Sequence, residues 1–152
     1  MSNDTELPDA FFLMIDEPLN GGTANAVGMN CMGLVRVSGK TTPPEAGYSL
    51  SYVRVAIRSG TTPLTEQDAR NGKKVVNVVP DTTDPTLNRW SGDFGPVRCS
   101  GTGCAIPDDA CVRAFAFYEK LSGPPKEQFS PNTAFKAKCV PQGADPGGPV
   151  PS

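Results

Sequence analysis

The five cysteines are the residues of this chain whose spacing says most about its chemistry. Cys99 and Cys104 enclose only the four small residues Ser-Gly-Thr-Gly, so the chain between them can fold back on itself. This spacing predicts a local disulfide, because chains kept in a reducing compartment seldom concentrate cysteines in this way. A zinc site built from Cys99, Cys104, Cys111 and another cysteine is the alternative, although the spacings match no common zinc motif.

A second disulfide is expected between Cys111, which begins one apolar run, and Cys139, which lies near the end of the next. A symmetric hairpin would place these cysteines opposite each other, with Phe115 opposite Phe135. A register slip of one residue would break the pairing and move every side chain to the other face. The long connection at 119–132 does not define the register, so the pairing depends on a symmetric hairpin.

Cys31 is then the odd cysteine. It is an even number of residues from Val35 and Val37, so in one strand its side chain would lie on their face, which predicts a buried and unreactive thiol. A bond to another cysteine, or to another chain, is the alternative. The cysteine content as a whole favours a protein that works outside a reducing cytoplasm.

The chain contains no histidine, which removes the commonest general base and the commonest metal ligand. Two pairs of acids remain: Asp81 and Asp84 in one loop, and the adjacent Asp108 and Asp109. Such pairs could serve glycoside hydrolysis or bind calcium through loop oxygens. No surrounding pattern frames a substrate cleft, so we expect solvated turn residues, and no catalytic residue, metal or cofactor.

Aromatic side chains raise the further possibility of a glycan ligand. Tyr48, Tyr52 and Trp90 could stack on sugar rings.

Short runs of alternating apolar residues, separated by Gly and Pro, predict an all-β fold. The clearest run is 50–58, where Val53, Val55 and Ile57 share one face. Residues 65–72 predict the single helical turn, with a hydroxyl cap, early acids and a terminal Gly. Strands are expected at 11–15, 30–38, 50–58, 74–79, 87–94, 111–118 and 133–140. About seven antiparallel strands with no long helix indicate a β-sandwich.

Two of these strands are apolar on both faces, although the outer face of a two-layer sandwich is usually polar. Either long loops cover the extra apolar side chains, or these side chains contact another subunit. The expected interface residues are Phe12, Met14, Phe115 and Phe117.

Charge and composition divide the chain into three parts. Residues 1–10 form an acidic arm, 11–140 the folded domain, and 141–152 a tail rich in Pro and Gly. The net charge of -2 gives no field that would select nucleic acid, and no apolar stretch is long enough for a membrane span. The first residues also lack the pattern of a signal peptide.

A family resemblance appears along the same strands. The segments 15–21 (Ile-Asp-Glu-Pro-Leu-Asn-Gly), 35–39, 53–60 and 112–116, together with Trp90, resemble bacterial immunoglobulin-like domains. Such domains occur in surface proteins, secreted enzymes and phage particles. The resemblance implies an immunoglobulin-like sandwich, with Pro-x-x-Gly ending the first strand and Trp90 in the core rather than on a sugar, and implies no single function.

These observations favour a non-catalytic structural or accessory subunit of a repeated extracellular assembly. A virion decoration or tail-associated protein is the first specific hypothesis, with copies of itself or a scaffold protein as partners bound through the arm, the tail and one sheet face. The second hypothesis is a cell-surface adhesion or carbohydrate-binding module.

Overall fold

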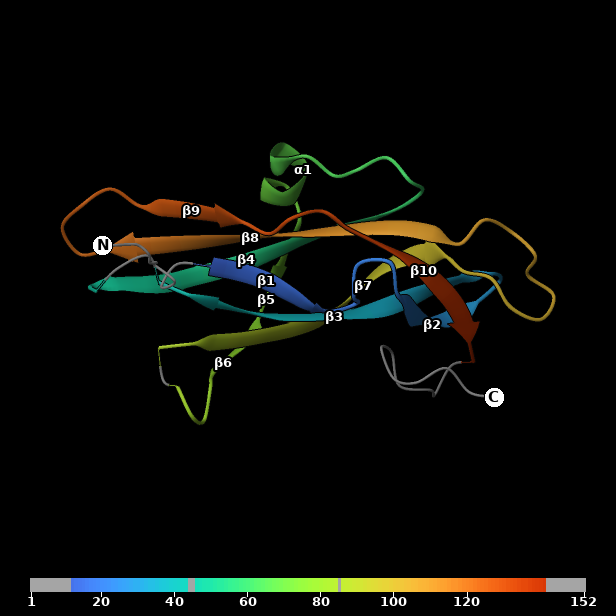
Figure 1. Ribbon diagram of the computed structural model, residues 1–152, viewed down its shortest axis with the longest axis horizontal. Helices are drawn as coiled ribbons and strands as arrows, with labels where there is room; N and C mark the ends of the chain where they lie inside the picture. The colour runs from blue at the N-terminus through green and yellow to red at the C-terminus, as the bar shows by residue number, and fades with distance from the viewer. Residues whose placement is uncertain (1–11, 44–45, 85, 142–152) are drawn as a thin grey trace, which may run out of the picture.

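The computed structural model describes residues 12–43, 46–84 and 86–141. This part of the chain is all-β with one short helix (Figure 1). The strands are β1 (Phe12–Glu17), β2 (Thr23–Met29), β3 (Met32–Thr42), β4 (Tyr48–Ser59), β5 (Lys73–Val75), β6 (Asn77–Pro80), β7 (Asn88–Arg98), β8 (Asp109–Lys120), β9 (Lys126–Phe129) and β10 (Thr133–Val140); the helix α1 is Glu66–Arg70.

All ten strands belong to one sheet that curls into a nearly closed barrel. One side of the barrel has the order β1-β3-β7-β6, and the other has β5-β4-β8-β10, with β9 beside the second half of β8. β2 joins the two sides, because it pairs in parallel with β10 and antiparallel with β3. Opposite β2, the chain crosses between the sides at Val76, since β5 pairs with β4 while β6 pairs with β7.

The core is formed by alternate residues of the long strands, as their period-two pattern requires. The predicted inward face of β4 is confirmed, because Val53 and Val55 are buried. They belong to one buried cluster with Val112 of the neighbouring strand β8 and with Val35 and Trp90 of the facing strands.

Polar contacts of Tyr118 cross this core. The hydroxyls of Tyr118 in β8 and Thr41 in β3 share a hydrogen bond of 2.9 Å, and both residues are buried. Burial raises the pKa of Tyr118 to about 12, against the opposing effect of its hydrogen bonds to Thr41 and Asn88. A neutral phenol with satisfied hydrogen bonds therefore fixes the position of one side of the barrel against the other.

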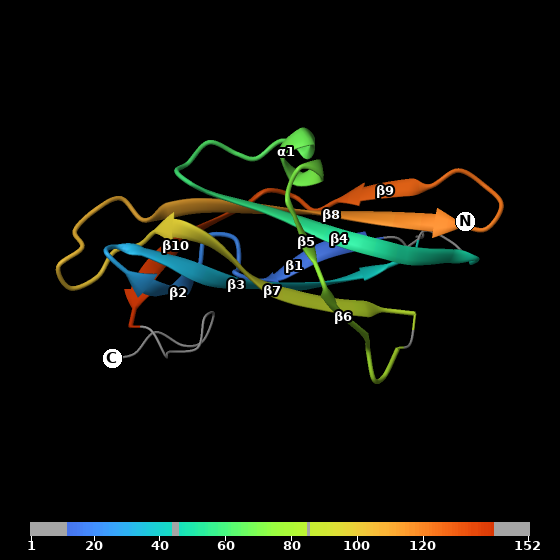
Figure 2. The ribbon, with the colours of Figure 1, turned by 180° about the vertical axis from the view of Figure 1, so that it is seen from behind.

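The predicted helical turn is confirmed. Thr65 caps α1, since its hydroxyl accepts from the backbone N–H of Asp68 while the Asp68 carboxylate accepts from the backbone N–H of Thr65. α1 packs on the outer side of β4 and β8 (Figure 2).

The all-β prediction is confirmed, but the number of strands differs. β2 and β9 were not expected, because 23–29 is rich in Ala and Gly and 126–129 is mostly polar. The single strand expected at 74–79 is divided into β5 and β6, which belong to opposite sides of the barrel. Within the described residues, no helix is long and apolar enough to cross a bilayer.

We predict that Tyr118→Phe lowers the free energy of unfolding by about 1–2 kcal/mol, the usual cost of losing a buried hydrogen bond. Tyr48→Phe is the matched control, because the Tyr48 hydroxyl donates to the Pro124 carbonyl at 2.8 Å without crossing the core. Urea unfolding of both variants measures the difference. Equal losses would contradict a special role for the cross-core bond.

Candidate functional site

Two disulfides lie at one end of the barrel, and their pairing differs from the prediction. Cys31 is bonded to Cys104, and Cys99 is bonded to Cys139. The expected Cys99–Cys104 and Cys111–Cys139 pairs are therefore wrong, although Cys99, Cys104 and Cys139 are all in disulfides. Cys111 is a buried free thiol.

The register of β8 and β10 explains why Cys111 does not meet Cys139. Cys111 lies opposite Ala134, and Phe135 lies opposite Ala110 rather than Phe115. β10 then leaves β8 and continues beside β2, where Cys139 is in register with Ala26. The hairpin is therefore not symmetric, and Cys139 lies beyond the part of β10 that pairs with β8.

Cys31 is not on the inner face of a strand. Asn30 and Cys31 form the turn between β2 and β3, with φ angles of 59° and 63°. Its even spacing from Val35 and Val37 therefore does not place its side chain on their face, and the predicted buried thiol is wrong. Recognising β2 would have revealed this turn, but the Ala- and Gly-rich segment carries little apolar signal.

The predicted interface residues are in different environments. Met14 is 42% exposed, whereas Phe115 is only 2% exposed and Phe117 is half-buried. Phe115 lies 5.1 Å from the ring of Phe129 in β9 and 6.3 Å from that of Phe117, measured between ring centres. The connection at 119–132 thus covers Phe115, so the prediction that it is exposed is wrong. The side chain of Phe12 lies outside the described residues.

The acid pairs make local structural contacts. The Asp81 carboxylate accepts hydrogen bonds from Thr83, from Arg89 and from the backbone N–H of Asp84. These bonds, the one from the Thr83 hydroxyl most of all, hold the pKa of Asp81 well below its usual range. Asp84 accepts from Thr86 in the next turn.

The second acid pair is likewise engaged. Asp108 accepts from the Ser100 hydroxyl, which chiefly lowers its pKa, with smaller effects from Lys136 and Lys138. The Lys136 ammonium is 2.7 Å from Asp109. Neither acid pair forms a cluster suited to a metal, and no group of three or more potential ligands does so among the described residues.

The three aromatic residues proposed for sugar stacking are not available as a platform. Tyr48 and Trp90 are buried, and Tyr52 is stacked on Phe117 with the Arg54 guanidinium 5.0 Å from its ring centre.

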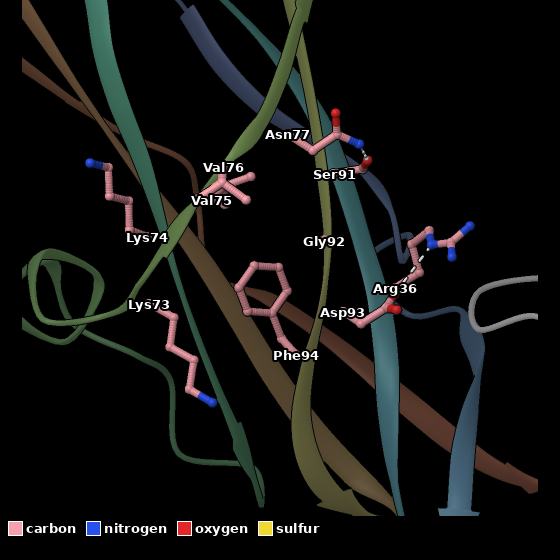
Figure 3. A pocket seen from close by; sticks show the side chains of 10 residues that line it. All are labelled: Arg36, Lys73, Lys74, Val75, Val76, Asn77, Ser91, Gly92, Asp93 and Phe94. Carbon is pink, nitrogen blue, oxygen red and sulfur yellow. Dashed lines mark hydrogen bonds and ion pairs between the residues drawn. The ribbon is translucent and has the colours of Figure 1, made fainter. Parts of the chain in front are cut away.

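A groove of about 480 Å³ lies where the chain crosses from β5 to β6 (Figure 3). Phe94 of β7 points into it and forms an apolar floor that is 4% exposed. Lys73 and Lys74 lie on the β5 wall, followed by Val76, which is 89% exposed. On the side of β7 away from the groove, the Arg36 guanidinium donates a hydrogen bond of 3.2 Å to the Asp93 carboxylate.

This groove borders an unpaired stretch of sheet edge. β6 pairs with β7 only as far as Ser91, so within the described residues no strand pairs with 92–98 on this side. A smaller cavity of about 220 Å³ continues the groove toward β4 and shares Lys73 and Phe94 with it. The free edge is short, because Pro96 has no N–H to donate. Backbone polar groups, an apolar floor and basic side chains together suit an extended acidic peptide.

We predict that mass mapping without reduction finds Cys31 joined to Cys104 and Cys99 joined to Cys139, with Cys111 alkylated only after unfolding. Replacing either disulfide by two alanines should lower the free energy of unfolding by about 2–4 kcal/mol, since each constrains the unfolded chain. Cys111→Ala, which removes no cross-link, is the control and should cost less. A Cys99–Cys104 peptide would contradict the described pairing.

We also predict that Asp81 makes stability depend on pH. Because its folded pKa is lowered from an unfolded value near 3.8, ionised Asp81 stabilises the fold above that pH, and this contribution declines as the pH falls below it. Asp81→Asn should therefore lower the melting temperature at pH 7, and the difference from the parent protein should shrink below about pH 4. A difference that stays constant with pH would exclude the charge as its cause.

Comparison with models of known protein families gives no match, and neither does comparison with curated protein sequences.

Proposed function

We propose that this protein is a non-catalytic structural or accessory subunit of a repeated assembly outside the reducing cytoplasm. The observation that carries the proposal is the groove beside β7, where an unpaired sheet edge lies next to an apolar floor. Unpaired edges are templates for pairing with another chain, and natural monomers usually cover them or blunt them.

We further propose that the fold is an immunoglobulin-like sandwich. The orders β1-β3-β7-β6 and β5-β4-β8-β10 match the A-B-E-D and C′-C-F-G sheets of that fold. On this reading, the groove lies between strands C′ and E, at the edge where strand D is short. The double pairing of β2 makes the two sheets continuous.

The occupant that fits the groove is the acidic arm of a second copy. Residues 1–11 carry Asp4, Glu6 and Asp9 with the apolar Leu7 and Phe11, and no basic residue. Lys73 in the groove has the complementary charge, and Lys74 lies next to it with its ammonium 5.8 Å from the Tyr52 ring centre; both lysines are exposed. The arm joins the fold at β1. β3 lies between β1 and β7, so the arm starts on the edge of the sheet that is away from the groove. Transfer of the arm to a neighbour would therefore link copies in a row, as a heterologous contact does.

A virion decoration or tail-associated protein remains our specific choice, because the resemblance includes domains of phage particles and because two disulfides suit an oxidising environment. The carbohydrate-binding alternative is weakened by the burial of Tyr48 and Trp90. Adhesion through a protein contact at the same groove is compatible with the geometry.

We predict that Lys73→Glu with Lys74→Glu weakens self-association roughly tenfold, the effect of about 1.4 kcal/mol in binding free energy. Replacing Asp4, Glu6 and Asp9 by lysine should weaken it similarly, and a mixture of the two variants should associate again because the charges are exchanged. Sedimentation velocity at low and high salt measures the association. Lys126→Glu in β9 is the matched control.

Two results would contradict the proposal. If the parent chain is monomeric at every concentration and salt, the groove does not join copies. If the charge variants associate as the parent does, the interface lies elsewhere.

A further inference from the structure

A second surface, independent of the groove, is the outer face of the hairpin formed by β2 and β3. Val27 pairs with Leu34, and Met29 pairs with Met32, so these four side chains share one face. Met29 is 61% exposed, Leu34 41% and Met32 36%. We call these four residues the methionine–leucine row.

The apolar character is confined to this end of β3. Further along the same face, each side chain of β3 has a polar partner. Arg36 forms an ion pair with Asp93, and Lys40 lies 3.8 Å from Asp16. Between them, the Ser38 hydroxyl donates a hydrogen bond to Glu17. One strand face therefore changes from exposed apolar side chains to paired polar ones within a few residues. An exposed apolar row of this kind marks a contact surface.

The described chain ends beside this row. Val140 of β10 is in register with Val27, and Pro141 is the last described residue (Figure 1). Neighbouring strands are about 4.8 Å apart. Val27 and Met29 of β2 are therefore one strand away from β10, and Met32 and Leu34 of β3 are two strands away. The eleven residues that follow Pro141 could extend about 36 Å, several times this distance.

The composition of that segment suits the row. Residues 142–152 contain Pro146, Pro149, Val150 and Pro151, and their only charged side chain is Asp145. Proline reduces the conformational entropy that such a segment loses on docking, and methionine side chains adapt to irregular apolar surfaces. Attachment at Pro141 also gives the segment a high effective concentration at the row, which no separate molecule has.

We propose that residues 142–152 of the same chain dock on the methionine–leucine row, with Val150 and its flanking prolines in contact with Met29, Met32 and Leu34. The sequence alone suggested that this tail contacts a neighbouring copy. The position of Val140 beside Val27 favours the row of the same chain.

Methionine oxidation tests this proposal in the full-length protein. Hydrogen peroxide converts exposed methionine to the sulfoxide, and peptide mass spectrometry gives the rate at each site. Met14 is the internal reference, because it is 42% exposed and pairs with Lys40, six residues along β3 from Leu34. We expect Met29 and Met32 to oxidise several-fold more slowly than Met14, at a rate that does not change with protein concentration.

Val150→Asp should remove this protection, raising the rates at Met29 and Met32 while leaving Met14 unchanged. Ser152→Asp adds the same charge without removing an apolar contact, and is the matched control. Because the tail contains no described strand, both variants should melt like the parent, which separates loss of docking from loss of folding.

Two outcomes would overturn the proposal. Protection that appears only at high protein concentration would assign the row to a second copy. If Met29 is oxidised at least as fast as Met14, as its greater exposure predicts, and Val150→Asp has no effect, the tail does not cover the row. Neither outcome bears on the groove, which Lys73 and Lys74 test separately.

Discussion

The double pairing of β2 is the constraint on which the rest of this fold depends. β2 pairs with β10 on one edge and β3 on the other, and so makes one sheet from what would otherwise be two. Two glycines make this possible: a Cβ on Gly28 would lie 2.2 Å from the Met32 carbonyl oxygen, and one on Gly33 would lie 2.6 Å from the Ala26 carbonyl carbon. Closure on this side brings Cys31 and Cys139 near the loop that carries Cys99 and Cys104, so both disulfides depend on it.

On the opposite side of the barrel, no described strand pairs with both sides in this way. There the chain passes from β5 to β6 in one step, and each of these short strands covers only part of its neighbour. The groove is therefore a product of topology rather than of any single side chain. Its floor is Phe94, a core residue, so a ligand in the groove would contact the same ring that packs with Val55 and Trp90 inside.

The strands that the sequence predicts well are those whose own side chains alternate clearly. β4 and β8 were expected within a few residues of their bounds, and the cap at Thr65 follows from local chemistry. What could not be predicted depends on residues distant in the chain. The pairing of Cys139 required knowing that β10 leaves β8 for β2, and the burial of Phe115 required a polar segment, β9, to be recognised as a strand. The groove was missed for the same reason, because the run at 74–79 gives no sign of crossing between the two sides.

The two disulfides have a mechanical consequence. Each has one cysteine in the six-residue stretch from Cys99 to Cys104, and the other two cysteines are Cys31 and Cys139. Tension applied between the two ends of the chain would pass from Cys31 to Cys104, along that stretch to Cys99, and across to Cys139. Residues 32–98 and 105–138 lie outside this covalent path, so they cannot be drawn out by force while the bonds are intact. Residues 1–31, 99–104 and 139–152 lie on the path and could extend, whereas β3 to β9 and most of β10 would stay within the two stretches that the disulfides close off from the load.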